Sequence, residues 1–402
     1  MKIVQINAAY NKGSIGRTTA ELHRWLMQKG EDSYVFTTSG NLSDKNVYCI
    51  GNSIERKIHS LCSRLFGLQG YFSQMATMCL INHLNRIKPD IIHLRNLHAN
   101  YINLHMLLNY IADNNIGCVI TLHDCWFLTG HCCYYVNVGC RKWLTECHHC
   151  PMIKRDNNSW LFDFSRKKFN DKKKLLNKIH KLAVLGNSKW TLEQAKKSYL
   201  KNAPIVDFVY NWIDRETFYP RKTVNYWKNL NIPNGQFVLL GVCEGWCKAK
   251  GLNVFIELAK KNPEYCFILV GGLAEETELP LNVIDVKRTQ NNDELCEYYT
   301  HADVLLNPSV QETFGKVSAE ALCCGTPIIV NRATANPELV GDGCGYVVDN
   351  NDIEQYAEYI QIIKKNGKET YSNSCIEFAK ANFDKETNIV DNMKVYKRLL
   401  RL

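Results

Sequence analysis

Short apolar runs alternate with amphipathic helical patterns along the whole chain, from the N-terminal run 3–6 onward. Helical patterns such as 18–29 and 254–261 separate many of these runs. Strands that alternate with helices are typical of parallel sheets with helices packed on both faces, so the pattern predicts an α/β protein. The predicted strands are 3–6, 33–37, 91–93, 118–122, 182–185, 237–241, 266–270, 283–285, 304–307 and 327–330.

The length of 402 residues predicts two α/β domains rather than one. A boundary is expected near 209–220, where a polar stretch and Pro220 interrupt the alternation. We therefore expect one doubly wound domain over 1–212 and a second over 213–380. Ligands of such domains bind at the carboxyl ends of the strands, so candidate chemistry is expected in the loops that follow strands.

Composition narrows the class of protein but does not name a partner. Hydrophobic residues make up 46% and charged residues 22% of the chain, which is typical of a globular protein. No apolar run is long enough to span a membrane, and residues 1–7 are too polar for a signal peptide, so a cytoplasmic protein is expected. The formal charge of +9 attracts nucleotides, phospholipids and nucleic acids alike, so it does not choose among them.

The segment 304–327 carries the strongest motif, a predicted strand, loop and helix followed by Gly325 and another strand. Gly315 at the helix start lets a ligand approach the backbone, and the free N–H groups of a first helical turn bind anions. Lys316 adds a positive charge there, and Glu320 follows one turn later on the same face. A carboxylate at that position can accept hydrogen bonds from two neighbouring hydroxyls, as a ribose offers.

A second candidate loop follows the predicted strand 237–241 and contains Lys248 and the pair Lys250-Gly251. In the first domain, Gly13 and Gly16 follow the first strand and open a helix, without the third glycine of a dinucleotide fingerprint. His123 ends the strand 118–122, and His98 lies after the strand 91–93. Polar groups at strand ends are candidates for ligand contact.

These motifs resemble those of the large retaining glycosyltransferase family 4, which includes many capsule and lipopolysaccharide sugar transferases. The family signature is two glutamates separated by seven residues and then Gly-Thr/Ser-Pro, which matches Glu312, Glu320 and 325–327. The resemblance implies the GT-B fold, two Rossmann-like domains facing a central cleft. It also implies an acceptor-side domain at 1–212, a donor-binding domain at 213–380, and a C-terminal helix, 381–402, that packs back on the first domain.

The same resemblance assigns roles to individual residues. It implies that Glu312 faces the donor sugar, that Glu320 holds the ribose and that Lys250 is one of two cations on the diphosphate. The family's second cation is an Arg where this chain has Gly245, so Lys248 or Lys316 is expected to replace it. The expected catalytic residues are His123, Glu312 and Lys250, and the expected donor-binding residues are Gly16, Lys248, Lys250, Glu312, Phe314, Gly315, Lys316 and Glu320.

Cysteines cluster at 132–150, between the predicted strands 118–122 and 182–185 of the first domain. Cys147-x-x-Cys150 suits one half of a zinc site, which Cys132 and Cys140 complete in the first of two interpretations. In the second interpretation these are free thiols packed in a loop. Catalysis by such a metal is not expected, because the loop lacks the carboxylates that a sugar-phosphate metal prefers.

Basic residues crowd the segment 166–181, with apolar residues able to share its other face. One interpretation is a solvated helix face, and the other is contact with the anionic inner face of a membrane, where a lipid-linked acceptor is held. No nucleic-acid-binding signature accompanies these charges, so no nucleic acid partner is expected.

The sequence thus predicts a retaining, metal-independent glycosyltransferase of capsular, exopolysaccharide or lipopolysaccharide biosynthesis. Its expected partners are a UDP- or GDP-sugar and a saccharide or lipid-linked acceptor, and no cofactor is required for the reaction. Two alternatives are a sugar-nucleotide epimerase of GT-B shape and a non-catalytic nucleotide-sugar-binding protein, which the missing Arg at Gly245 favours. A glycosidase acid/base pair at Glu312 and Glu320 fits poorly, because the pair flanks a phosphate-type helix start.

Overall fold

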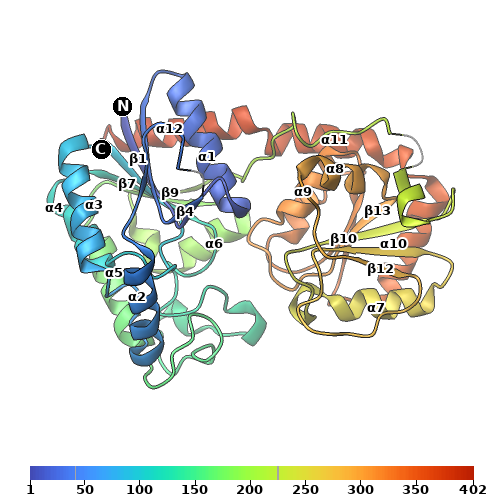
Figure 1. Ribbon diagram of the computed structural model, residues 1–402, viewed down its shortest axis with the longest axis horizontal. Coiled ribbons are helices and arrows are strands. Elements are labelled where there is room, and N and C mark those ends of the chain that lie inside the picture. Colours follow the sequence, from blue (N-terminus) through green and yellow to red (C-terminus); the bar gives the residue numbers. More distant parts are fainter. Residues whose placement is uncertain (41, 224–225) are drawn as a thin grey trace. The chain divides into compact units, whose positions relative to one another are not determined.

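Two separate parallel β-sheets organise the chain in a computed structural model, which describes residues 1–40, 42–223 and 226–402 (Figure 1). Unit 1 comprises Met1–Val209 and Ile389–Leu402, and unit 2 comprises Tyr210–Asn388. Each unit has its own buried apolar cluster around its sheet. The expectation of two doubly wound α/β domains is confirmed. The domain boundaries predicted from the sequence were residues 212 and 380.

The sheet of unit 1 has the strand order β5-β3-β1-β6-β7-β8-β9, and every neighbouring pair is parallel. Five of its strands were predicted from apolar runs, whereas β5 and β9 at the two edges were not. A small ladder joins β2 (Ala9–Tyr10) and β4 (Ser39–Gly40). The strands are β1 (Lys2–Ile6), β3 (Asp32–Thr37), β5 (Val47–Cys49), β6 (Ile91–Leu94), β7 (Gly117–Leu122), β8 (Leu182–Gly186) and β9 (Ile205–Phe208).

Helices of unit 1 connect these strands, and the last helix of the chain returns to the same unit. His93 of β6 is bonded through Nδ1 to the hydroxyl of Tyr396 at 2.6 Å, which ties the final helix to the sheet. The helices are α1 (Gly13–Gln28), α2 (Ser53–Phe66), α3 (Gln74–Ile87), α4 (Leu104–Asp113), α5 (Ser165–Asn177), α6 (Lys189–Lys197) and α12 (Lys385–Leu399), with 3-10 turns η1 (Val136–Val138), η2 (Lys142–Leu144) and η3 (Tyr199–Asn202).

The sheet of unit 2 has the order β12-β11-β10-β13-β14-β15, again entirely parallel. Its strands are β10 (Val238–Val242), β11 (Cys266–Val270), β12 (Val283–Val286), β13 (Val304–Asn307), β14 (Ile328–Asn331) and β15 (Gly345–Val348). Its helices are α7 (Leu252–Lys261), α8 (Asn292–His301), α9 (Lys316–Cys323), α10 (Ile353–Asn366) and α11 (Glu369–Phe383), with 3-10 turns η4 (Tyr226–Leu230), η5 (Lys248–Lys250) and η6 (Asn336–Leu339).

Each sheet reverses its strand order once, between β1 and β6 in unit 1 and between β10 and β13 in unit 2. Loops that leave the carboxyl ends of two such strands diverge to opposite faces, which opens a crevice for a ligand. The loops that follow β10 and β13 are those that carry the sequence motifs 243–251 and 308–315. The fold therefore places the candidate chemistry of unit 2 at its switch point.

Among the helices that the structure describes, none is both long enough and apolar enough to cross a membrane.

Candidate functional site

Lys250 and Glu312 meet at the switch point of unit 2. Lys250 ends η5 after β10, Glu312 lies in the loop after β13, and the Lys250 Nζ donates to Glu312 Oε1 at 2.6 Å. Burial alone would lower the pKa of Lys250, but the Glu312 carboxylate raises it above its ordinary value. The lysine is therefore held as a cation, and the two residues form one paired charge site across neighbouring strand loops.

Gly315 starts α9 beside this pair, as the sequence predicted. Its φ of 89° lies in the left-handed region, and a Cβ added there would come within 2.7 Å of Leu339 Cδ1. Lys316 follows at the first helical position and is partly buried. The Phe314 side chain is buried, with its ring centroid 5.3 Å from that of Phe383, so it packs in the core of unit 2. In this structure Phe314 supports the loop 308–315 from the core of unit 2.

Glu320 lies one turn along α9, and its side chain is almost completely buried at 3% exposure. The Tyr299 hydroxyl, from α8, donates to Glu320 Oε2 at 2.9 Å. This bond is one of about four that a carboxylate can accept. The sequence reasoning did not anticipate Tyr299, because a single tyrosine within a helix carries no motif.

The loop after β10 rests on the loop after β11. Trp246 is buried and its backbone N–H donates to the Gly272 carbonyl at 2.9 Å. Gly271 has a φ of 122°, and a Cβ there would collide with the Cys243 carbonyl, so this contact requires glycine. Gly245 is different: a Cβ added there meets no atom within 4 Å. The position at which the resemblance predicted an Arg is thus sterically open, and the exposed Lys248 follows it in η5.

In unit 1, His123 follows β7 and is buried at 6% exposure. Its Nε2 lies 3.1 Å from Nη1 of Arg95, a buried arginine at the end of β6. Because a guanidinium only donates, His123 accepts through Nε2, and burial followed by the charge of Arg95 lowers its pKa to about 3. His123 is therefore a neutral imidazole, which can exchange hydrogen bonds but does not supply a positive charge.

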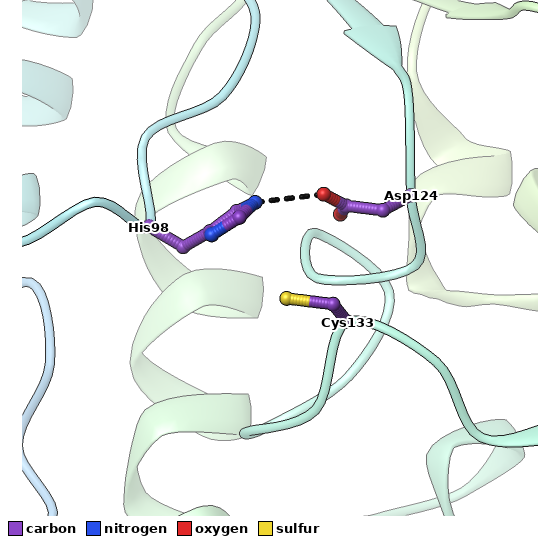
Figure 2. A group of neighbouring side chains, drawn as sticks. All are labelled: His98, Asp124 and Cys133. Atoms are coloured by element: carbon purple, nitrogen blue, oxygen red, sulfur yellow. Dashed lines mark hydrogen bonds and ion pairs between the residues drawn. The ribbon is translucent and has the colours of Figure 1, made fainter. Parts of the chain in front are cut away.

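His98, Asp124 and Cys133 converge from three loops (Figure 2), and their ligand atoms all lie within 4.8 Å of one another. His98 Nε2 is 2.7 Å from Asp124 Oδ2, while the Trp126 N–H donates to Asp124 Oδ1 at 2.8 Å. Burial alone would lower the pKa of His98, but the Asp124 carboxylate raises it well above its ordinary value. Burial raises the pKa of the Cys133 thiol. The group is an imidazolium–carboxylate ion pair beside a neutral thiol.

Gly16 lies within the first turns of α1 and is buried. A Cβ at this position would lie 3.2 Å from the Ala9 carbonyl oxygen, so the glycine lets α1 pack closely against the segment after β1. Gly13, with a φ of 66°, begins the helix. The glycine spacing is therefore explained by packing within unit 1, and the role of Gly16 toward a donor stays a prediction.

The four cysteines predicted to bind zinc all line one small pocket of unit 1 together with His131 and Trp143. Cys147 Sγ accepts from the Gly130 N–H at 3.2 Å, and bonding to Cys150 together with burial raises the pKa of Cys132. Within the described part of the chain, however, His98, Asp124 and Cys133 are the one group with three metal-capable atoms within 4.8 Å. Zinc binding by Cys132, Cys140, Cys147 and Cys150 stays a prediction.

The basic segment 166–181 is not a uniformly solvated face, which corrects that interpretation. Lys168 and Lys172 of α5 are buried, at 4% and 2% exposure. Lys168 Nζ lies 2.6 Å from His131 Nδ1, and Lys172 Nζ lies 3.9 Å from the ring centroid of Trp126. Burial lowers the pKa of Lys172 to about 7. These two lysines support the cysteine loop from inside unit 1.

Sequence reasoning also missed Arg95 and Asp124 as partners of the two candidate histidines. Both lie within two residues of the end of a predicted strand, Arg95 after β6 and Asp124 after β7. Neighbouring parallel strands end at the same edge of a sheet, so their positions were a usable signal. The pairings themselves, Arg95 with His123 and Asp124 with His98, depend on the strand order β6-β7, which the sequence does not state.

Sequence profiles of two transferase families match the chain. Residues 15–217, half of the chain, match Glycosyltransferase Family 4, and residues 228–382 match Glycosyl transferases group 1. The second match contains Lys250, Glu312 and Glu320. The division between the two profiles falls near the boundary between units 1 and 2.

Among individual relatives, the O-antigen biosynthesis glycosyltransferase WclY of Escherichia coli is 29% identical over 175 residues, 41% of this chain and 46% of WclY. The D-inositol 3-phosphate glycosyltransferase of Mycobacterium sp. (strain KMS) is 26% identical over 212 residues, 49% of this chain and 48% of that protein. The matches thus span about half the length of these curated relatives.

Solved structures show the same fold over nearly the whole chain. A glycosyltransferase from Rickettsia africae ESF-5 has a TM-score of 0.71 at 14% identity, covering 99% of this chain and 98% of its own. Anabaena Alr3699/HepE in complex with UDP has a TM-score of 0.71 at 15% identity, covering 99% and 100%. The expectation of the GT-B fold is confirmed.

Proposed function

The chain belongs to glycosyltransferase family 4, and we propose that it transfers a sugar from a nucleotide diphosphate-sugar to a hydroxyl group of an acceptor. The donor is a UDP- or GDP-sugar, the acceptor is a saccharide or lipid-linked saccharide, and the product belongs to a surface polysaccharide or lipopolysaccharide. The similarity to an O-antigen biosynthesis glycosyltransferase supports that setting. The observation that carries the proposal is the Lys250–Glu312 pair at the switch point of unit 2.

Lys250 and the start of α9 are the groups that would hold the donor diphosphate. A lysine ammonium held as a cation and the free backbone N–H groups of the helix start both favour phosphate oxygens. When a diphosphate arrives, Lys250 turns from Glu312 to phosphate, and the released carboxylate accepts hydroxyls of the donor sugar. Glu320 completes the donor half-site by accepting ribose hydroxyls beside the Tyr299 phenol.

The proposed reaction retains the anomeric configuration and needs no metal ion. The bond between the anomeric carbon and the leaving phosphate oxygen breaks, and a bond to the acceptor oxygen forms on the same face of the sugar. The acceptor proton passes to the departing phosphate. Lys250 and Lys316 stabilise the negative charge that develops on that phosphate. This electrostatic stabilisation is the main source of rate acceleration at such a site. His123, a neutral imidazole, orients sugar hydroxyls by hydrogen bonding.

We also propose a cytoplasmic location for this reaction, at the inner face of the membrane. All 18 cysteines are free thiols, which suits a reducing compartment. A structural zinc ion on Cys132, Cys140, Cys147 and Cys150 belongs to the same proposal. It requires their sulfurs to draw together to a tetrahedral set with Zn–S distances of about 2.3 Å. Metal analysis of the purified protein, with Cys147→Ser/Cys150→Ser as the variant, tests it.

The test of function is a thermal-shift screen with UDP-, GDP-, ADP- and dTDP-sugars, followed by turnover with saccharide acceptors. We expect stabilisation by one nucleotide class, transfer that persists in EDTA, and a product whose anomeric NMR signal matches the donor. Conversion of the sugar nucleotide without any acceptor would instead identify an epimerase. Binding without transfer or hydrolysis would identify a non-catalytic protein, the alternative that Gly245 in place of the family's Arg leaves open. Turnover that only magnesium or manganese restores would contradict metal independence.

A further inference from the structure

Helix α2 (Ser53–Phe66) is packed with its apolar face outward. The two residues of this helix that are buried are polar, His59 and Ser63. On the opposite side, Ile54, Ile58 and Leu61 are 69%, 57% and 51% exposed. Their spacing of four and three residues places them on one stripe of the helix. A helix of a soluble protein normally turns such a stripe toward the core, so its exposure indicates a binding surface.

The inward orientation of the polar face is fixed by specific hydrogen bonds. His59 Nδ1 is 2.7 Å from Ser73 Oγ, and the Gly70 N–H donates to His59 Nε2 at 3.2 Å. Burial lowers the pKa of His59 to about 4, so the ring is neutral and its bonds persist at physiological pH. The outward apolar stripe is therefore built into the fold of unit 1.

Two neighbouring segments extend this apolar surface. At the N-terminal end of α2, Glu55 Oε1 accepts from the Ala76 N–H at 3.0 Å, which places the exposed Met75 of α3 nearby. At the C-terminal end, the Trp160 N–H donates to the Arg64 carbonyl, which seats the exposed run 160–162, Trp-Leu-Phe, beside the helix. We call these parts together, the outer side of α2, the first turn of α3 and residues 160–162, the apolar–basic face.

The charges on helices α2 and α3 are mostly positive. Helices α2 and α3 contain one acidic residue between them, Glu55, and it is engaged by the backbone of α3. Their basic residues include the exposed Lys57, Arg64 and Arg86. Aliphatic and aromatic side chains flanked by Lys and Arg are the composition of protein surfaces that lie in the interface of an anionic bilayer.

A polar pocket of about 430 Å³ adjoins the C-terminal half of α2. Arg64 and Arg155 line it, and among the described residues neither side chain forms an ion pair. Ser63 Oγ and Asn158 Oδ1 also belong to pocket residues, and both are buried without a hydrogen-bond partner. Two guanidinium groups and a serine hydroxyl that can donate suit a phosphate group.

We propose that the apolar–basic face docks on an anionic phospholipid membrane, with a lipid headgroup phosphate bound between Arg64 and Arg155. The apolar side chains of α2 and the 160–162 run enter the boundary between headgroups and acyl chains, and the basic residues stay at headgroup level. The inference does not depend on sugar transfer, because the face lies in unit 1 and uses none of the donor-site residues. It assigns membrane contact to α2, not to the basic segment of α5.

The experiment is flotation of the full chain with phosphatidylcholine vesicles that contain or lack phosphatidylglycerol. Two variants test the face: Ile58→Glu/Leu61→Glu for the apolar stripe and Arg64→Ala/Arg155→Ala for the pocket. Two variants serve as matched controls: Leu281→Glu, an exposed leucine of unit 2, and Lys173→Ala/Lys174→Ala, two exposed lysines of α5. Circular dichroism and a nucleotide thermal shift verify that each variant folds.

We expect the wild type and both controls to float with anionic vesicles, and the stripe variant to lose binding at least tenfold. Each arginine removed should weaken binding about fivefold, and inorganic phosphate should not release the protein. A wild type that stays unbound, or a stripe variant that floats equally, would overturn the proposal. So would loss confined to the α5 control, or a wild-type dimer that the stripe variant dissociates, which would make a second copy the occupant. Transfer to a soluble acceptor should be unchanged, which separates this outcome from failure of the proposed function.

Discussion

Replacing Lys250 by Ala should weaken nucleotide binding far more than it weakens the fold. A charge-assisted hydrogen bond to a phosphate oxygen is worth about 1.5–3 kcal/mol, which corresponds to about a 10- to 150-fold change in dissociation constant. Within the folded protein, Lys250 is paired with Glu312 at 2.6 Å, with the two side chains 35% and 20% exposed. An ion pair this exposed contributes about 0–1 kcal/mol to the free energy of unfolding, so the melting temperature should fall by about 4 °C at most.

Glu312→Gln is the complementary variant, because it removes the negative charge that competes with phosphate for Lys250. A nucleoside diphosphate without a sugar should bind Glu312→Gln as well as the wild type or better. The complete nucleotide-sugar should bind less well, because the carboxylate that accepts sugar hydroxyls is gone. Lys250→Ala should weaken both ligands equally, so the two variants are separated by which part of the donor they affect.

Calorimetric titration with the diphosphate and with its sugar conjugate measures this pattern. Lys260→Ala, which removes an exposed lysine at the other end of α7, is the matched control and should leave both affinities unchanged. The reasoning is refuted if Lys250→Ala binds the diphosphate like the wild type, or if Glu312→Gln loses the diphosphate as strongly as the conjugate. Either result would mean that the Lys250–Glu312 pair stabilises the loops of unit 2 and does not bind the donor.

Three further predictions concern neighbouring features. Gly245→Arg should fold normally, because an added Cβ meets no atom within 4 Å, and should raise donor affinity about tenfold by calorimetry; Lys248→Ala should lower it. Glu320→Gln should weaken nucleotide binding about tenfold, whereas Tyr299→Phe, which leaves the carboxylate in place, should change it less, and equal effects of the two variants would contradict the ribose role. Burial lowers the pKa of His123 from 6.5 to about 3. The unfolded chain therefore takes up this proton first as the pH falls below 6.5, and the free energy of unfolding should drop by roughly 1–2 kcal/mol at pH 5. His123→Asn should flatten that slope in denaturant melts measured across pH.

The donor loops were predictable from sequence because each carries its own local motif. Gly315 and Lys250-Gly251 occur in the loops that follow apolar runs which do form β13 and β10. What the sequence did not contain was the contact between Lys250 and Glu312, which lie 62 positions apart along the chain. That contact exists because β10 and β13 are neighbours in the sheet although β11 and β12 separate them in sequence. Strand order is a property of packing between elements, and a motif within one element does not encode it.

The same limit explains the contacts that the sequence did not predict in unit 1. His123 and His98 were identified by their places after strands, but their partners Arg95 and Asp124 come from the adjacent strand. Burial lowers the pKa of both histidines; the Arg95 guanidinium lowers that of His123 further, whereas the Asp124 carboxylate raises that of His98 above its ordinary value. A chemical role assigned from residue type alone therefore leaves the charge state undetermined.

Helix α2 shows that an amphipathic pattern does not predict which side of a helix faces the core. The periodicity of Ile54, Ile58 and Leu61 is the same whether the stripe faces a core or a solvent boundary, because the pattern fixes only which residues share a side. The direction is decided by the opposite side, where His59 finds partners in Ser73 and in the backbone of Gly70. A helix whose polar face is satisfied internally has no reason to bury its apolar face as well. The apolar stripe is then available to contact a lipid bilayer, and Arg64 beside it favours an anionic bilayer.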